Sequence, residues 1–168
     1  FENNVTNYAA QQLADGKVVA WFQGAMEAGP RALGNRSILA DPRDVRNRDR
    51  VNEKVKFRES WRPFCPSVLA DKSDEYFINP TQCPYMINTF TVSKKTEQVA
   101  PAIVHVDNTA RPQFVTESAN QKYYRLIQEF FGTTGVPMLL NTSMNIKGEP
   151  ICCTPGDALQ LFFATDID

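Results

Sequence analysis

The chain has 168 residues, of which 42% are hydrophobic and 22% charged, the composition of a globular domain that can bury a sizeable core. No apolar run approaches the ~18 residues that a membrane-spanning helix needs, and no secretory signal opens the sequence. The formal net charge is −1, which by itself predicts nothing about partners. Interleaved acids, a pI near 5.9 and the lack of a platform of aromatic and basic residues make a nucleic-acid partner unexpected. Composition therefore predicts a protein without a membrane segment.

Short helices and strands are expected to alternate through the first half of the chain. Hydrophobic periodicity and turn residues predict, in order, a helix over Asn4–Asp15, a buried strand over Lys17–Phe22, a turn over Gly24–Pro30, a strand over Ser37–Ala40, a polar helix over Val45–Val55, an extended segment over Pro66–Ala70 and a helix over Ser73–Phe77. The first helix should direct Tyr8, Ala9 and Leu13 toward the core.

The second half begins with three expected strands, over Tyr85–Val92, Ala102–Val106 and Gln113–Thr116. Ser118, followed by Gln121, has the spacing of a capping box, which predicts a helix start there. That helix should bury Tyr124, Ile127 and Phe131 and end at Gly132 or Gly135. A strand over Pro137–Leu140 should then enter a loop over Asn141–Gly148, and Thr154, Pro155 and Asp157 should start a last helix.

These elements mix without a strict βαβ rhythm, so the predicted fold class is α/β (α+β), a twisted mixed β-sheet flanked by helices. No repeat or low-complexity linker divides the sequence, and residues 1–168 are predicted to form a single domain. The chain starts at Phe1 rather than Met, and Asp168 follows a helix-like run without a closing element. A piece of a longer two-domain protein is the expectation.

The four cysteines, Cys65, Cys83, Cys152 and Cys153, form no C-x-x-C pair, and the chain has one histidine. A metal site within the chain is therefore not expected. Reduced, mostly buried thiols in a cytoplasmic protein are the simplest interpretation.

Positive charge is concentrated between Arg31 and Arg62, a window with ten cations and five acids and therefore a charge of +5. Such a concentration favours an anionic ligand, because a guanidinium group matches phosphate oxygens and stays charged. A solvated helix face is the alternative, and it fits the residues that alternate with acids: Arg43, Arg46, Arg48 and Arg50.

Three polar clusters occupy positions after strands or in loops, where binding sites are commonly built. Their candidate ligand-binding side chains are Arg31 and Arg36 in Gly24–Ser37, Lys56, Arg58 and Arg62 in Lys56–Pro63, and Asn141, Ser143 and Asn145 in Leu139–Pro150. An extended second cluster would present Lys56 and Arg58 on one face. Each cluster also has an ordinary structural interpretation: a glycine-rich turn, a charged strand edge and a polar loop.

Three further side chains are candidates. His105, on the strand expected over Ala102–Val106, could bind phosphate or carry a proton, or could be a hydrogen-bonded structural histidine. Arg111 could bind an anionic oxygen. Glu27 could act as a base or support Arg31, with a plain ion pair as the simpler expectation.

Four runs together resemble the C-terminal region of the NodU/CmcH-type O-carbamoyltransferases: Gly29–Arg43, Asn52–Pro63, His105–Arg111 and Gly135–Pro150. The resemblance spans about Asp15 to Asp168. It implies a YrdC-like fold, similar to threonylcarbamoyl-adenylate synthases, whose nucleotide site uses a Lys-x-Arg pair and a Ser-x-Asn pair. Lys56-Phe57-Arg58 and Ser143-Met144-Asn145 match these pairs. The first motif departs from the family's pattern at Ala25 and Ala28.

The resemblance also implies an activity. In this family the domain would activate carbamoyl phosphate with ATP and Mg²⁺ to carbamoyl-adenylate, and an N-terminal transfer domain would pass the carbamoyl group to a hydroxyl. Lys56 and Arg58 would be the catalytic cations, and Arg31, Arg36, Arg62, His105, Arg111, Asn141, Ser143 and Asn145 would bind the ligands. Two alternatives stay open: a nucleotide- or RNA-binding module without activity of its own, and a threonylcarbamoyl-adenylate synthase.

Overall fold

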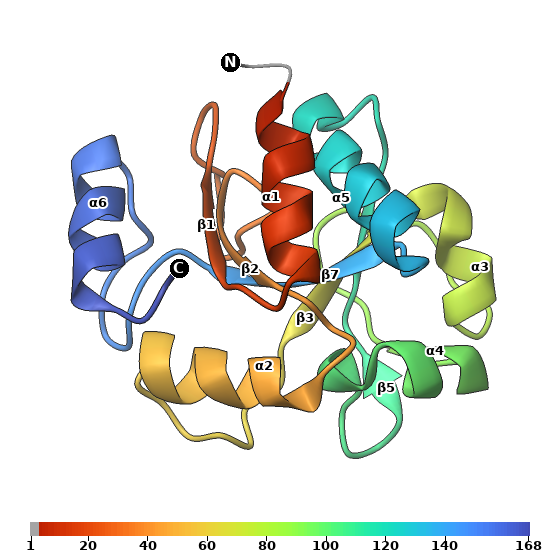
Figure 1. Ribbon diagram of the computed structural model, residues 1–168. Helices are drawn as coiled ribbons and strands as arrows, with labels where there is room; N and C mark the ends of the chain where they lie inside the picture. Colours follow the sequence, from red (N-terminus) through yellow and green to blue (C-terminus); the bar gives the residue numbers. More distant parts are fainter. Residues whose placement is uncertain (1–3) are drawn as a thin grey trace.

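Five short apolar strands pair into one mixed sheet in the computed structural model, which describes residues 4–168 (Figure 1). The strands lie in the order β1-β2-β7-β3-β6. They are β1 (Val19–Phe22), β2 (Arg36–Ala40), β3 (Cys65–Leu69), β6 (Gln113–Val115) and β7 (Met138–Ser143). β3 and β6 run parallel, and the other neighbouring pairs run antiparallel. The predicted twisted mixed sheet flanked by helices is confirmed.

The helices and the remaining strands connect and cover this sheet. They are α1 (Val5–Ala14), α2 (Val45–Arg50), the π-helical turn η2 (Val51–Val55), the 3₁₀ turn η3 (Ala70–Lys72), α3 (Ser73–Tyr76), β4 (Phe90–Thr91), α4 (Lys94–Val99), the 3₁₀ turn η4 (Pro101–Ile103), β5 (Thr109–Ala110), α5 (Gln121–Thr134) and α6 (Pro155–Ala164). β4 and β5 form a separate antiparallel pair. No helix among the described residues is long and apolar enough to cross a membrane.

α1 and α5 lie side by side (Figure 1) and bury apolar side chains against the sheet. In α1, Ala9 and Leu13 point inward as predicted, but Tyr8 is 65% exposed, so that part of the prediction was wrong. In α5 the buried face is Tyr123, Leu126, Ile127 and Phe130, one residue earlier than two of the predicted positions. The packing partner, not the helical period alone, decides which side faces inward.

α5 also begins later than predicted. Asn120, not Ser118, is its N-cap and accepts a hydrogen bond from the Tyr123 amide, because the Ala119 and Asn120 amides are taken by a turn on the Thr116 carbonyl. The helix ends at Gly135, which has φ 74°, a left-handed conformation that glycine adopts without steric cost.

Two predicted strands in the middle of the chain were mostly wrong. Of Tyr85–Val92, only Phe90 and Thr91 form a strand, and Met86 has a positive φ of 54°, which extended pairing does not allow. In Ala102–Val106, the preceding Pro101 begins a 3₁₀ turn instead. β-branched composition favoured strands here, but neither segment finds a neighbouring strand along its length.

One predicted helix is built from two helical types, and one predicted strand is longer than expected. The polar helix over Val45–Val55 is present as α2 followed by the π turn η2. Arg43, just before α2, and the three arginines within it pair with acids: Arg43 with Asp41, Arg46 with Asp44, Arg48 with Asp49 and Arg50 with Asp166 and Asp168. β7 continues to Ser143 through residues predicted as loop, since it is paired on both sides.

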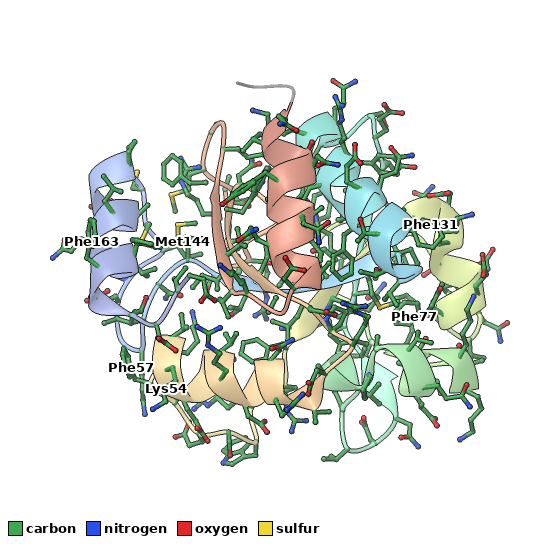
Figure 2. All side chains as sticks on the ribbon, in the orientation of Figure 1. Lys54, Phe57, Phe77, Phe131, Met144 and Phe163 are labelled. Atoms are coloured by element: carbon green, nitrogen blue, oxygen red, sulfur yellow. The ribbon has the colours of Figure 1, made fainter. Side chains whose placement is uncertain are left out.

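α6 starts as predicted. Thr154 and Asp157 form a capping box, with Pro155 in the first turn. The helix lies beside the edge strand β1 (Figure 1), and its Phe163, labelled in Figure 2, is 81% exposed.

Candidate functional site

A cationic cleft lies where the end of β7 meets the turn before β2 and the start of β3. Its cavity volume is about 130 Å³, and it is lined by Pro30, Arg31, Ala32, Arg58, Pro63, Phe64, Cys65, Met86, Arg111, Asn141, Thr142 and Ser143. Three of these residues are arginines, and none is acidic. The cavity is smaller than the ~300 Å³ of a typical small-molecule pocket, so it suits an anionic group rather than a whole nucleotide.

The turn that carries Arg31 is held in shape by Glu27. One carboxylate oxygen of Glu27 accepts hydrogen bonds from the Leu33 amide at 2.6 Å and the Asn35 amide at 2.8 Å. The expected Glu27–Arg31 ion pair is absent from the described residues, because the carboxylate is turned toward the backbone amides. Arg31 is exposed at the tip of this turn and faces the cleft.

Lys56 brings the second and third polar clusters together. Its ammonium donates to the Ser143 carbonyl at 2.8 Å, the Asn145 carbonyl at 2.7 Å and Asn145 Oδ1 at 2.7 Å. Ser143 Oγ in turn donates to Asn145 Oδ1 at 2.6 Å. Thus the Lys-x-Arg and Ser-x-Asn pairs, which are remote in sequence, are joined by direct contacts.

Burial makes this ammonium unusual. Lys56 is only 4% exposed, and its burial and the nearby Arg58 charge lower the pKa of Lys56 from 10.5 to about 7. The three close oxygen acceptors match the three protons of the charged form. An anion placed near a lysine with these surroundings would favour its charged, protonated form.

Arg58 is not on an extended strand, so the predicted one-face alternation with Lys56 was wrong. The intervening Phe57, labelled in Figure 2, has φ 47° and turns the chain sharply. The guanidinium of Arg58 lies over the Phe64 ring, 4.6 Å from its centroid, and Nε donates to Asn52 Oδ1 at 2.7 Å. Burial, and then the Arg62 charge, lower the pKa of Arg58. Its Nη2 is buried without a hydrogen-bond partner.

The floor of the cleft is built from paired strands. Cys65 of β3 lies opposite Asn141 of β7, and the Cys65 sulfur accepts from Arg111 Nε at 3.3 Å and Nη2 at 3.2 Å. The Asn141 side chain donates to Ala32 and Ser67. Its Oδ1 is buried without a partner.

Five predicted site residues do not line this cleft. Lys56 and Asn145 lie beside it and bind each other, next to the lining residue Ser143. The other three are Arg36, Arg62 and His105. Arg36 is buried, stacks on Phe22 and donates to the carbonyls of Gln23, Gly24, Asn35 and Cys153. Arg62 is exposed and pairs with Glu59 at 2.8 Å. His105 lies in a turn rather than on the predicted strand, with Nδ1 3.3 Å from Thr109 Oγ1.

Several cleft residues were missed by sequence reasoning: Phe64, Cys65, Met86 and Thr142, together with Asn52 behind Arg58. Apolar and neutral side chains carry no local signal for a binding site. For Asn52, the one sequence signal is its position at the start of Asn52–Pro63, a run that carries the family resemblance.

The cleft does not form a site for a resident Mg²⁺. Mg²⁺ favours carboxylate and other oxygen ligands, and no carboxylate is among the described lining residues. No chemical step is therefore assigned to a protein-bound Mg²⁺.

The fold is similar to that of two groups of solved structures. Sua5 of P. abyssi, crystallised with L-threonine, superposes with a TM-score of 0.71 at 17% identity over 100% of this chain and 46% of Sua5. Full-length HypF in its phosphate- and nucleotide-bound form gives 0.63 at 17% identity over 96% of this chain and 20% of HypF. The molecule thus has the Sua5/YrdC-like fold predicted.

The sequence comparisons show the family. Residues 10–168 match the family described as "Carbamoyltransferase C-terminus", and the chain belongs to it. Nodulation protein NolNO of Sinorhizobium fredii is 47% identical over 99% of this chain and 25% of its own length. The 3'-hydroxymethylcephem-O-carbamoyltransferase of Amycolatopsis lactamdurans is 43% identical over 82% of this chain and 26% of its own length. The chain thus spans about a quarter of these relatives.

Proposed function

We propose that this domain activates carbamoyl phosphate with ATP, giving carbamoyl-adenylate for transfer to a hydroxyl by another part of a longer protein. The observation that carries the proposal is the convergence of Arg31, Arg58 and Arg111 on a cleft whose described lining has no acid. Membership of the carbamoyltransferase family and a fold shared with a nucleotide- and phosphate-bound HypF support it.

The size of the cavity favours carbamoyl phosphate, the smaller of the two substrates, as the one bound inside it. About 130 Å³ accommodates the phosphate end of carbamoyl phosphate, with the nucleotide placed over the open side. Arg31 and Arg111 would bind phosphate oxygens, and Arg58 would lie between the two reactants. Asn141, with a buried and unpartnered Oδ1, would accept a hydrogen bond from the carbamoyl nitrogen.

The reaction balances with one water. Water releases orthophosphate from carbamoyl phosphate, the carbamate oxygen attacks the α-phosphorus of ATP, and the bond to the β-phosphate oxygen breaks, so that pyrophosphate leaves. Lys56 and Arg58 would offset the charge that builds up at the α-phosphate, while Ser143 and Asn145 fix the Lys56 ammonium. No lining side chain needs to form a covalent intermediate, so catalysis would depend on positioning and electrostatics.

The test is ATP–pyrophosphate exchange with and without carbamoyl phosphate, with mass spectrometry for carbamoyl-AMP. Carbamoyl-phosphate-dependent exchange is expected, and Arg58→Ala should cost roughly 2–4 kcal/mol of transition-state stabilisation. Arg46→Ala is the matched control, because Arg46 is exposed, paired with Asp44 and absent from the cleft lining. Near-normal product formation by Arg58→Ala would reject the assignment of Arg58.

Parallel reactions separate the alternatives. ATP binding without any product would favour a nucleotide-binding module. A threonylcarbamoyl-adenylate product, formed only when L-threonine is added, would favour a synthase of that class. RNA binding that falls steeply with salt would favour an RNA-binding module.

A further inference from the structure

The buried side chain of Asn52 makes contacts that connect the π-helical turn to the cationic cleft. Asn52 is 0% exposed and lies in η2, between the surface helix α2 and Lys56. π-helical turns are rare and are frequently found at functional sites. Here the turn is closed by the Lys56 amide, which donates to the Val51 carbonyl five residues earlier.

The three side-chain hydrogen bonds of Asn52 all go to one short segment, Arg58 to Arg62. Nδ2 donates to the Ser60 carbonyl at 3.1 Å and the Arg62 carbonyl at 3.0 Å, and Oδ1 accepts from Arg58 Nε at 2.7 Å. The Asn52 backbone carbonyl also accepts from the Arg58 amide at 3.0 Å. The backbone carbonyl of Asn52 therefore holds the start of the loop, and its side chain holds the Ser60 and Arg62 carbonyls and the Arg58 guanidinium.

The bond to Nε determines which edge of Arg58 is available. A guanidinium is planar, and its donors have a fixed geometry. With Nε held by Asn52 and the plane lying over Phe64, the two Nη atoms are left for another partner. Nη2 is buried and has no hydrogen-bond partner in the described protein, which is the arrangement an incoming anionic oxygen would satisfy.

We propose that Asn52 is a positioning residue, which holds the Arg58 guanidinium edge-on to the cleft so that it binds the anionic substrate without rearranging. The proposal rests on the proposed function for the identity of the ligand. Asn52 itself touches no substrate. Its effect on ligand binding should pass entirely through Arg58, whereas a purely structural residue would affect binding whether or not Arg58 is present.

The first experiment needs no ligand. The Nε–H signal of Arg58, assigned by its loss in Arg58→Ala, should be resolved and protected from solvent exchange in ¹⁵N NMR spectra of the wild-type protein. Asn52→Ala should abolish that protection. Asn52→Asp keeps the acceptor and the shape but loses the two carbonyl contacts, and it should retain the protected signal. Asn47→Ala, which removes an amide bound only to the Asp41 carbonyl, is the matched control.

The second experiment is a double-mutant cycle on ATP binding, measured by calorimetry. Asn52→Ala should weaken ATP binding about tenfold or more, as expected when a hydrogen bond to a charged group is lost. In the Arg58→Ala background it should have no further effect. An equal loss in both backgrounds, or wild-type affinity in Asn52→Ala, would overturn the proposal.

The failure of the two proposals can be told apart. If the wild-type protein binds no ATP, the proposed function fails, and the cycle is run with pyrophosphate as the anion. If wild type binds and Arg58→Ala does not, while Asn52→Ala binds normally, only the positioning role fails. If Asn52→Ala does not fold, Asn52→Asp decides: an exchanging Nε–H signal in that variant contradicts the proposal.

Discussion

Replacing Lys56 with methionine should remove a pH dependence from the stability of this domain. In the folded protein the pKa of Lys56 is lowered from 10.5 to about 7 by burial and by the Arg58 charge. At about 1.36 kcal/mol for each pH unit, this difference corresponds to roughly 5 kcal/mol, an order-of-magnitude value. Lys56 is 4% exposed, so solvent screens little of it.

The sign follows from proton counting. Between pH 7 and 10.5 the unfolded chain keeps the Lys56 proton while the folded domain has lost it, so the unfolded state binds more protons. The free energy of unfolding therefore gains a contribution that rises with pH across this window. This contribution is fully present above pH 10.5 and is lost as the pH falls through about 7.

Urea unfolding between pH 6.5 and 9.5 measures the effect. The wild-type minus Lys56→Met difference in unfolding free energy should rise with pH, with a slope of up to about 1.4 kcal/mol per pH unit. Lys54→Met, a change of an exposed lysine in the same turn, should leave the wild-type slope unchanged. Parallel curves for wild type and Lys56→Met would refute the reasoning, because they would mean that Lys56 titrates alike in both states.

Three further predictions concern the site and its supports. Binding of ATP at pH 8 should take up protons, since an anion near Lys56 favours the ammonium; calorimetry in two buffers of different ionisation enthalpy should show the uptake in wild type and a smaller one in Lys56→Met. Gly34→Ala should lower the melting temperature and cost more than about 2 kcal/mol of unfolding free energy, because Gly34 has φ 104° and a Cβ there would collide with the Tyr123 ring. The control Gly132→Ala should be tolerated, because there is open space around Gly132. Thr154→Ala removes the capping box of α6 and should cost about 1 kcal/mol in chemical denaturation.

Local sequence patterns were sufficient to predict the elements whose conformation depends on residues close in sequence. The capping box at Thr154, a glycine stop for α5 at Gly132 or Gly135, and the strands β1 and β2 follow from residue types and spacing. The structure selects Gly135, and it leaves the edge strand β1 only partly buried. The strand predicted over Tyr85–Val92 failed, because β-propensity reports how well side chains suit a sheet and not whether a partner strand is available.

In the candidate site, too, the sequence predicted some features and only the tertiary structure decided others. Residue types made Arg31 and the second and third polar clusters candidates for binding an anion, each with an ordinary structural alternative. The family resemblance then singled out the Lys56/Arg58 and Ser143/Asn145 pairs. Only the tertiary structure placed Lys56 within 2.8 Å of residues 87 and 89 positions away, turned Arg36 into the interior and left Arg62 on the surface. The physical reason is the sheet order: β7 is paired between β2 and β3, so its end reaches the cations that follow η2. Such pairing joins distant segments, and no local spacing encodes it.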